Sequence, residues 1–298
     1  VYKRQQWFQQ SRIYYILKTL SFSSILCIIT FIKGLIKVKV LVLQFRIEPA
    51  NAQQNENKIK QLFDKHVTAN TECVVLPEMW NNGYALEKLN DLADHNLERS
   101  QQFIAQLAQD YNVAIVAGSV SNIKNDKVYN TAFTVNQSGE IINSYDKVHL
   151  VPMLQEPDYL EAGDKVPEAF QLTDDVTATQ IICYDLRFPE LLRYPARKGA
   201  QIAFYVAQWP EARKAHWRAL LQARAIENDM FVVGSNGCGN DGSTEYAGHS
   251  IVVNPNGEVL AELEHEEGQI ELDLNMEEVA QQRKAIPVFE NLRKELYK

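Results

Sequence analysis

Three segments of the chain place a charged or reactive side chain directly after an apolar run. These side chains are Glu78, Lys147 and Cys183, and the runs before Glu78 and Cys183 are rich in β-branched residues. Such runs predict buried strands. Because α/β proteins gather their sites at the carboxyl ends of strands, the three side chains could converge on one place.

A carboxylate, an ammonium group and a thiol brought together would form a coherent set for acyl transfer. A nearby cation gives a cysteine thiolate character, and a carboxylate can take the thiol proton and later pass it to the leaving group. The ammonium group can stabilise the oxyanion of a tetrahedral intermediate, beside a backbone N–H after Cys183. This set suits an amide or nitrile substrate and needs no metal.

Each of the three residues also has a purely structural interpretation. A cysteine at the end of an apolar strand is usually an inert part of the core. Glu78, which follows Pro77, could cap a helix, and Lys147 could be a solvated surface residue. The hypothesis of a site therefore depends on their joint placement.

Other motifs favour different chemistry only weakly. Residues 237–242 match G-x-G-x-x-G, but no helix signal follows, so we interpret them as a flexible surface loop. Residues 121–124 match S-x-x-K in a polar turn, and the chain contains no G-x-S-x-G. The six histidines form no H-x-x-x-H pair and the four cysteines no C-x-x-C pair, which argues against zinc and against a disulfide framework.

The composition is that of an acidic globular protein. Of the 298 residues, 46% are hydrophobic and 23% are charged, and the net charge is −8. An acidic chain is not expected to bind nucleic acid. The few scattered cysteines indicate a reducing compartment, and we expect a cytoplasmic location with no membrane partner.

The first 37 residues differ in composition from the rest, because they contain six basic residues and no acidic one. Residues 19–32 are uncharged, but this run is shorter than the ~20 residues that span a bilayer. The segment could be a signal-peptide core, an interfacial anchor or a non-native extension. No clean small-x-small cleavage site follows residue 32, and we favour a non-native extension that packs little against the rest.

From residue 38 onward the hydrophobic pattern alternates between strand and helix periods. It predicts one α/β domain over residues 38–298, with βαβ units, antiparallel hairpins and therefore mixed sheets. Helices are expected over residues 51–69, 97–111, 212–228 and 276–284 and from residue 189. Strands are expected over residues 39–45, 73–77, 113–120, 177–182, 201–206, 230–235 and 269–272, and hairpins over 128–145 and 251–263.

The segments around Glu78, Lys147 and Cys183 resemble the Glu, Lys and Cys boxes of the nitrilase superfamily, the carbon–nitrogen hydrolases, in the family's order and with its typical spacing. The resemblance covers residues 38–298. It implies a four-layer α-β-β-α sandwich that is usually a homodimer, works without a cofactor and binds a small amide. It also implies Glu78 as general base, Lys147 as oxyanion stabiliser and Cys183 as nucleophile.

Members of this superfamily carry a second glutamate in the loop after the lysine box. Glu156 matches that position, and Glu161 is a second candidate closer to the glycine turn. A carboxylate at this position would hold Lys147 charged and oriented.

Further segments resemble one branch of the superfamily, the omega-amidases that act on 2-oxoglutaramate and similar 2-oxo amides. These segments are residues 183–191, 207–210, 213, 216–217, 223–228 and 283–289. The resemblance implies a thiol amidase that forms a thioester and releases ammonia. The alternatives are an N-carbamoyl amide hydrolase or a nitrilase with the same triad, or a catalytically silent nitrilase-like binding subunit.

A substrate with a distal carboxylate requires a cation in the pocket. Arg187 and Arg213 are candidates, although Arg187 could equally pair with Glu227 or Asp185. Aromatic residues could line the pocket or belong to the ordinary core. They are Tyr84, Tyr184 and Trp209.

Overall fold

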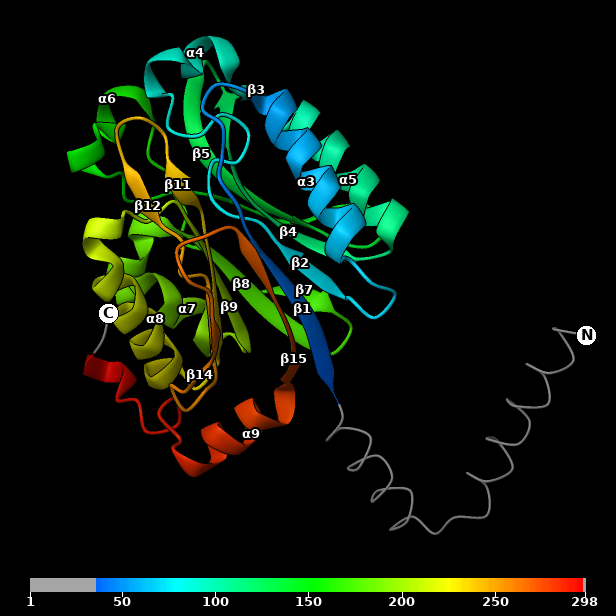
Figure 1. Cartoon of the computed structure of the whole chain (residues 1–298). Coiled ribbons are helices and arrows are strands. Elements are labelled where there is room, and N and C mark those ends of the chain that lie inside the picture. The colour runs from blue at the N-terminus through cyan, green and yellow to red at the C-terminus, as the bar shows by residue number, and fades with distance from the viewer. Residues whose placement is uncertain (1–35, 297–298) are drawn as a thin grey trace, which may run out of the picture.

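Two mixed β-sheets lie face to face in the computed structural model, which describes residues 36–296, and helices cover their outer faces (Figure 1). Helices α3 (Ala52–His66) and α5 (Glu98–Tyr111) cover one sheet, and α7 (Pro189–Arg197) and α8 (Lys214–Asn228) cover the other. The predicted four-layer α-β-β-α sandwich with mixed sheets is therefore confirmed.

The first sheet has the strand order β15-β1-β2-β4-β5-β6, and β3 pairs with β4 beside this path. Strands β1, β2 and β4 are parallel neighbours, whereas β15, β5 and β6 join antiparallel. The strands are β1 (Lys37–Gln44), β2 (Cys73–Val75), β3 (Asp94–His95), β4 (Ala114–Lys124), β5 (Lys127–Val135), β6 (Ile141–Asp146) and β15 (Gly268–Asn275).

The second sheet has the order β14-β13-β10-β9-β8-β7, with β8, β9 and β10 parallel. Its strands are β7 (Phe170–Thr173), β8 (Val176–Ile182), β9 (Ile202–Ala207), β10 (Phe231–Asn236), β13 (Ile251–Val253) and β14 (Val259–Glu262). The strands and helices expected from the sequence are all present. The short strands β3 and β7 were not predicted, because two to four residues carry too little periodicity.

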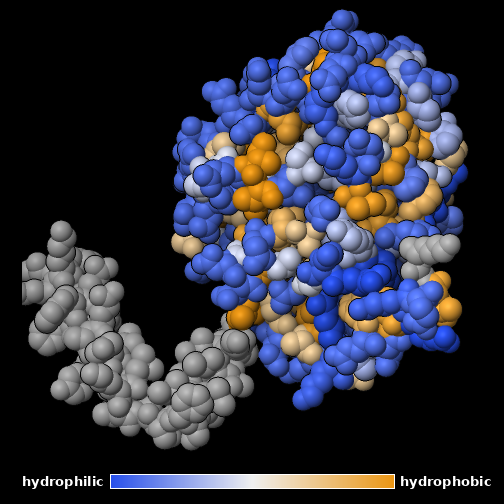
Figure 2. Space-filling view, turned by 180° about the vertical axis from the view of Figure 1, so that it is seen from behind, coloured by the Kyte–Doolittle hydropathy of each residue, from blue (hydrophilic) through white to orange (hydrophobic). Residues whose placement is uncertain are grey.

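Alternation along β1 explains how the layers hold together. Val40 and Val42 face the second sheet, whereas Leu41 and Leu43 face α3 and α5. Both faces of the strand are buried over residues 40–43, so this part of its sequence is continuously apolar instead of alternating. The outside is different: on the face shown in Figure 2, hydrophilic side chains predominate and hydrophobic ones form small groups.

One prediction is corrected at residues 237–242, because Cys238–Asn240 form a strand and the segment is not a loop throughout. Strands β11 (Cys238–Asn240) and β12 (Glu245–Ala247) pair as a hairpin in which Cys238 and Tyr246 are buried. The Asp241 side chain accepts hydrogen bonds from the backbone of the turn and from the Tyr246 hydroxyl. Such an Asx turn closes the hairpin. No helix follows, so the glycine pattern is not a dinucleotide-binding site.

The described fold includes Ile36 and Lys37, which lie before the expected boundary at residue 38. The Ile36 carbonyl accepts a hydrogen bond from Met276 N–H, the first residue of α9 (Met276–Ala285), and Lys37 is the first residue of β1. The hypothesis about the N-terminal extension concerns residues that, apart from Ile36 and Lys37, lie outside the described range. Among residues 36–296, no helix is long and apolar enough to cross a bilayer.

We expect a chain that starts at Ile36 to keep its fold and any activity, because it retains the whole of β1 and its pairing with β15. Soluble yield and thermal unfolding followed by circular dichroism would test this, with the full chain as control. Loss of soluble expression would contradict the expectation.

Candidate active site

Lys147 lies between two carboxylates at one end of the sandwich. Its Nζ is 3.0 Å from Glu78 Oε1 and 2.7 Å from Glu156 Oε1, and all three side chains are fully buried. Burial by itself lowers the pKa of Lys147, but the carboxylates of Glu156 and Glu78 outweigh it and hold that pKa well above its usual value. The ammonium group therefore stays charged inside the protein.

Strand ends position the residues of this cluster. Glu78 follows β2, and Lys147 follows β6 with its backbone N–H bonded to Asn130 O on the neighbouring β5. Gly118 on β4 allows the turn before Glu78 to approach closely, because a Cβ there would lie 1.9 Å from Pro77 O. Its φ of +57° also favours glycine.

Glu156 reaches Lys147 from the loop that follows it. It is the first residue of the short helix α6 (Glu156–Tyr159), and its Oε2 accepts from Val151 N–H at 2.7 Å. Glu161, the second candidate, instead pairs with Lys127 at 3.0 Å on the surface. The structure therefore places Glu156, and not Glu161, against Lys147.

Glu78 is held by donors on both of its oxygens. Oε1 accepts from Asn130 Nδ2 at 2.8 Å and from the Tyr84 hydroxyl at 2.9 Å, in addition to Lys147. Oε2 accepts from Gln208 N–H at 2.7 Å. This network fixes the direction of the carboxylate. Asn130 was not predicted, although an asparagine in the middle of a buried apolar strand was the available signal.

The Tyr84 hydroxyl lies between the two carboxylates, 2.8 Å from Glu156 Oε1 and 2.9 Å from Glu78 Oε1. Burial and both carboxylates raise the pKa of Tyr84 well above its usual value, so the hydroxyl keeps its proton. It carries one proton and can donate to only one carboxylate at a time. Tyr84 is therefore a partner of the charged cluster.

Cys183 stands at the junction of β8 and the turn of 3₁₀ helix Cys183–Arg187. Its φ is +40°, a left-handed conformation that is rare outside glycine and that costs of order 1–3 kcal/mol. Such strain is common at functional sites. Burial raises the pKa of the Cys183 thiol well above its ordinary value and Glu78 raises it further, whereas the Lys147 ammonium opposes them. These effects together favour the protonated form of the thiol.

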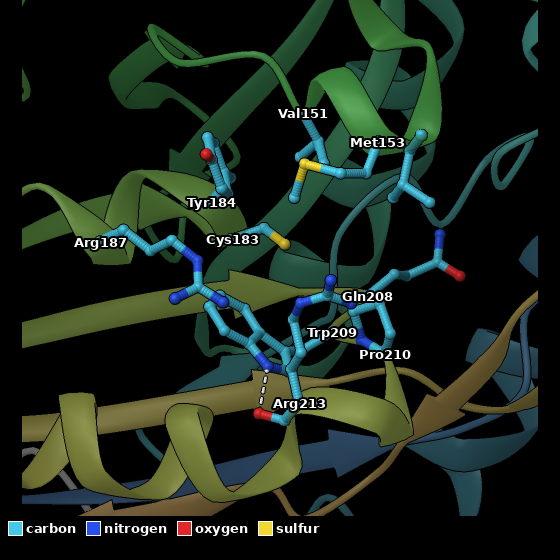
Figure 3. A pocket seen from close by; sticks show the side chains of 10 residues that line it. Val151, Met153, Cys183, Tyr184, Arg187, Gln208, Trp209, Pro210 and Arg213 are labelled. Carbon is cyan, nitrogen blue, oxygen red and sulfur yellow. Dashed lines mark hydrogen bonds between the residues drawn. The ribbon is translucent and has the colours of Figure 1, made fainter.

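A hollow opens in front of the Cys183 sulfur (Figure 3). Its walls are mostly apolar, with two guanidinium groups among them. The residues that line it include Met153, Tyr184, Arg187, Trp209 and Arg213.

Trp209 contacts both arginines of this hollow, Arg187 through its ring face and Arg213 through the backbone carbonyl. The Arg187 guanidinium carbon lies 4.8 Å from the centre of the Trp209 ring and 5.8 Å from that of Tyr184. Trp209 Nε1 donates to the Arg213 carbonyl at 2.9 Å, as the dashed line in Figure 3 shows. Both arginines thus belong to the wall around Cys183.

The structure answers the questions that the sequence left open about these side chains. Tyr184, Arg187, Trp209 and Arg213 line the hollow with Cys183, but Tyr84 does not and instead borders a separate hollow beside β12. The alternative pairing of Arg187 with Glu227 or Asp185 does not form within residues 36–296. Glu227 pairs with Arg224 at 3.0 Å, and Asp185 accepts from other donors.

The described part of the chain contains no set of side chains that could bind a metal ion. Within residues 36–296, no group of three or more His, Cys, Asp or Glu side chains is placed to hold a metal ion.

The family model for carbon-nitrogen hydrolases matches residues 39–284, which is most of the chain and includes all of the residues above. The chain belongs to the carbon-nitrogen hydrolase family. This carbon-nitrogen hydrolase therefore acts on C–N bonds other than peptide bonds. The expected membership of the nitrilase superfamily is confirmed.

Relatives of this carbon-nitrogen hydrolase include proteins with and without a stated substrate. It is 59% identical to a "hydrolase in agr operon" of Staphylococcus aureus, over 88% of this chain and 100% of that one. It is 40% identical to a 2-oxoglutaramate amidase of Bacillus subtilis, with the same coverage. Among solved structures, Saccharomyces cerevisiae Nit3, in branch 10 of the nitrilase superfamily, matches with a TM-score of 0.77 and 31% identity, over 87% of this chain and 96% of that one.

Proposed function

We propose that this hydrolase is an omega-amidase, which hydrolyses the terminal amide of a small 2-oxo dicarboxylate such as 2-oxoglutaramate to the acid and ammonia through a thioester on Cys183. The observation that carries the proposal is the buried Lys147 ammonium, held between the Glu78 and Glu156 carboxylates, together with the hollow that opens in front of the Cys183 sulfur. The 2-oxoglutaramate amidase relative supports the substrate class.

In the first half-reaction, Cys183 Sγ attacks the amide carbon while Glu78 takes the thiol proton. The carbonyl π electrons move to the oxygen, which Lys147 Nζ and a backbone N–H after Cys183 stabilise as an oxyanion. When the intermediate collapses, the C–N bond breaks and the nitrogen takes the proton from Glu78. Ammonia leaves, and the acyl group stays on sulfur as a thioester.

In the second half-reaction, a water molecule attacks the thioester carbon and Glu78 takes one of its protons. Collapse of the second tetrahedral intermediate breaks the C–S bond. The proton on Glu78 returns to the sulfur, which restores the thiol and releases the carboxylic acid. Glu78 therefore moves a proton in both halves, whereas Glu156 keeps Lys147 oriented.

The hollow in front of Cys183 suits an amide with a carboxylate at its far end. Arg187 and Arg213 supply cations that can pair with such a carboxylate, and a guanidinium group matches it in two hydrogen bonds. The apolar wall, which includes Met153 and Trp209, accommodates the carbon chain between the two ends.

Ammonia release from 2-oxoglutaramate, an N-carbamoyl amino acid and an aliphatic nitrile would test the proposal. We expect 2-oxoglutaramate to be the best substrate. Turnover of the N-carbamoyl compound or the nitrile alone would favour those alternatives. A folded protein that releases ammonia from none of them would favour a silent binding subunit.

Replacing Arg187 or Arg213 with methionine should raise KM for 2-oxoglutaramate by about tenfold or more, because methionine keeps bulk and removes the charge that pairs with a carboxylate. An uncharged aliphatic amide of similar length is the matched control, and its kcat/KM should change less than about threefold. Equal losses for both amides would contradict a role in binding the carboxylate.

We also propose a homodimer, as the resemblance to the superfamily implies, and a cytoplasmic location, as the few scattered cysteines indicate. Sedimentation velocity on the purified chain and fractionation of cells that express it would test these two expectations.

A further inference from the structure

Asp185 is a buried carboxylate that the proposed reaction does not use. It lies two residues after Cys183 in the same 3₁₀ turn, and its side chain is fully buried. Its oxygens nevertheless accept four hydrogen bonds, all from a segment that is distant in the sequence. A buried carboxylate is costly unless such partners compensate it.

The four donors flank Lys147 on both sides. Oδ2 accepts from the Tyr145 hydroxyl at 2.7 Å and from Val148 N–H at 3.2 Å. Oδ1 accepts from His149 N–H at 2.9 Å and from His149 Nδ1 at 2.7 Å. Since a carboxylate only accepts, Nδ1 must carry the hydrogen. One side chain on the Cys183 turn thus holds the residues two before, one after and two after Lys147.

Surrounding contacts keep this connection rigid. The His149 ring stacks on Phe188, with ring centres 3.5 Å apart and planes at 8°. The Phe188 N–H in turn donates to the Asp185 carbonyl at 3.0 Å. The segment that carries Lys147 is therefore joined to the turn that carries Cys183 by both side-chain and stacking contacts.

We propose that Asp185 is a positioning residue that sets the distance between Lys147 Nζ and the reacting atoms at Cys183. This inference rests on the proposed function, because it assumes that Lys147 and Cys183 act on the same substrate. A carboxylate is required for this task, because each of its oxygens accepts from a backbone N–H. An asparagine in either orientation would place its NH₂ group against one of those N–H donors.

Asp185→Asn should therefore displace the Lys147 segment relative to Cys183. We expect kcat for amide hydrolysis to fall about 10²-fold while KM changes less than about threefold, as for a misplacement of about 1 Å in a catalytic group. Ammonia release from the best amide substrate at saturating and limiting concentrations separates these two quantities.

A second measurement does not depend on the substrate at all. Iodoacetamide alkylation of Cys183, followed by mass spectrometry of its peptide, reports the protonation of the thiol as a function of pH. The charged groups that face this thiol are Glu78, Lys147 and Glu156. Because the Lys147 ammonium favours the thiolate, moving it away should shift the alkylation profile upward by about one pH unit.

Asp94→Asn is a matched control for the loss of a backbone-bound carboxylate. Asp94 also accepts one backbone N–H on each oxygen, from Arg99 at 3.1 Å and Ser100 at 2.7 Å, at the start of α5 on the surface of the first sheet. We expect this variant to lower the Tm while its kcat and its alkylation profile stay at wild-type values.

A folded Asp185→Asn variant with unchanged kcat and alkylation profile would overturn the proposal and leave Asp185 with a structural role only. If Asp185→Asn does not fold, the double variant Tyr145→Phe/His149→Ala decides, because it keeps the carboxylate and both backbone bonds. We expect about a tenfold loss of kcat in that variant, and wild-type behaviour would overturn the proposal. If no amide is hydrolysed but the alkylation profile shifts as expected, the proposed function fails and the positioning role stands.

Discussion

Replacing Cys183 with serine is expected to abolish ammonia release almost completely, with a loss of about 10⁴-fold or more in kcat. The hydroxyl keeps the shape of the thiol but is a much weaker acid than a thiol of ordinary pKa ~8.5. The serine hydroxyl is therefore much harder to deprotonate than the thiol, and the nucleophile is not formed.

The fold should survive this substitution, because Cys183 lines a hollow and the replacement is nearly isosteric. Circular dichroism and thermal unfolding are the controls, and mass spectrometry after incubation with the amide would detect a trapped acyl group. Near wild-type turnover by a folded Cys183→Ser variant would overturn the thioester mechanism. Cys73→Ser offers a comparison, because that cysteine is buried in β2 and plays no part in the reaction.

Glu78→Gln should cost far more activity than Glu156→Gln, although both carboxylates contact Lys147 at similar distances. Glu78 alone is proposed to move the proton, so its loss should lower kcat by about 10³-fold, within the range for a general base. Glu156 orients Lys147 through Oε1 and the loop through Val151 N–H on Oε2. We expect its replacement to lower kcat by roughly tenfold, since Lys147 keeps Glu78 as a partner.

Both variants remove one negative charge from the same buried cluster, which makes each a control for the other. The kcat for ammonia release at saturating substrate is the quantity to compare, with thermal unfolding to show that both remain folded. Equal losses of kcat at the two positions would mean that Glu156 also takes part in proton transfer. The Tyr84 hydroxyl, which lies between the two carboxylates, would then offer a route for the proton.

Local sequence was sufficient to predict the secondary structure wherever the hydrophobic period was sustained. Helix α5 could be predicted because burial of one helix face leaves apolar residues with a period of 3.6. Strand β8 could be predicted because burial of both strand faces leaves an unbroken apolar run. The hairpin β11–β12 was not, because its strands are three residues long and its turn depends on the side-chain hydrogen bonds of Asp241. Local pattern carries little information at that length.

The sequence by itself determined which residue types follow which strands, and hence that a carboxylate, an ammonium group and a thiol stand at strand ends. Glu78, Lys147 and Cys183 could be named on that basis alone. Their spacing along the chain also sufficed for the resemblance to the nitrilase superfamily. These properties are local, because an alternating or continuous apolar pattern reports the burial of the segment that contains it.

Only the tertiary structure decided which side chains meet. It places Glu156 rather than Glu161 on Lys147, puts Tyr84 between two carboxylates instead of in the hollow, and joins Asp185 to the Lys147 segment. These contacts join residues up to 72 positions apart. They depend on how the fold brings strands from two sheets to one end of the sandwich. The hydrophobic pattern of the sequence does not contain that information, because it shows that a residue is buried but not which residue it contacts.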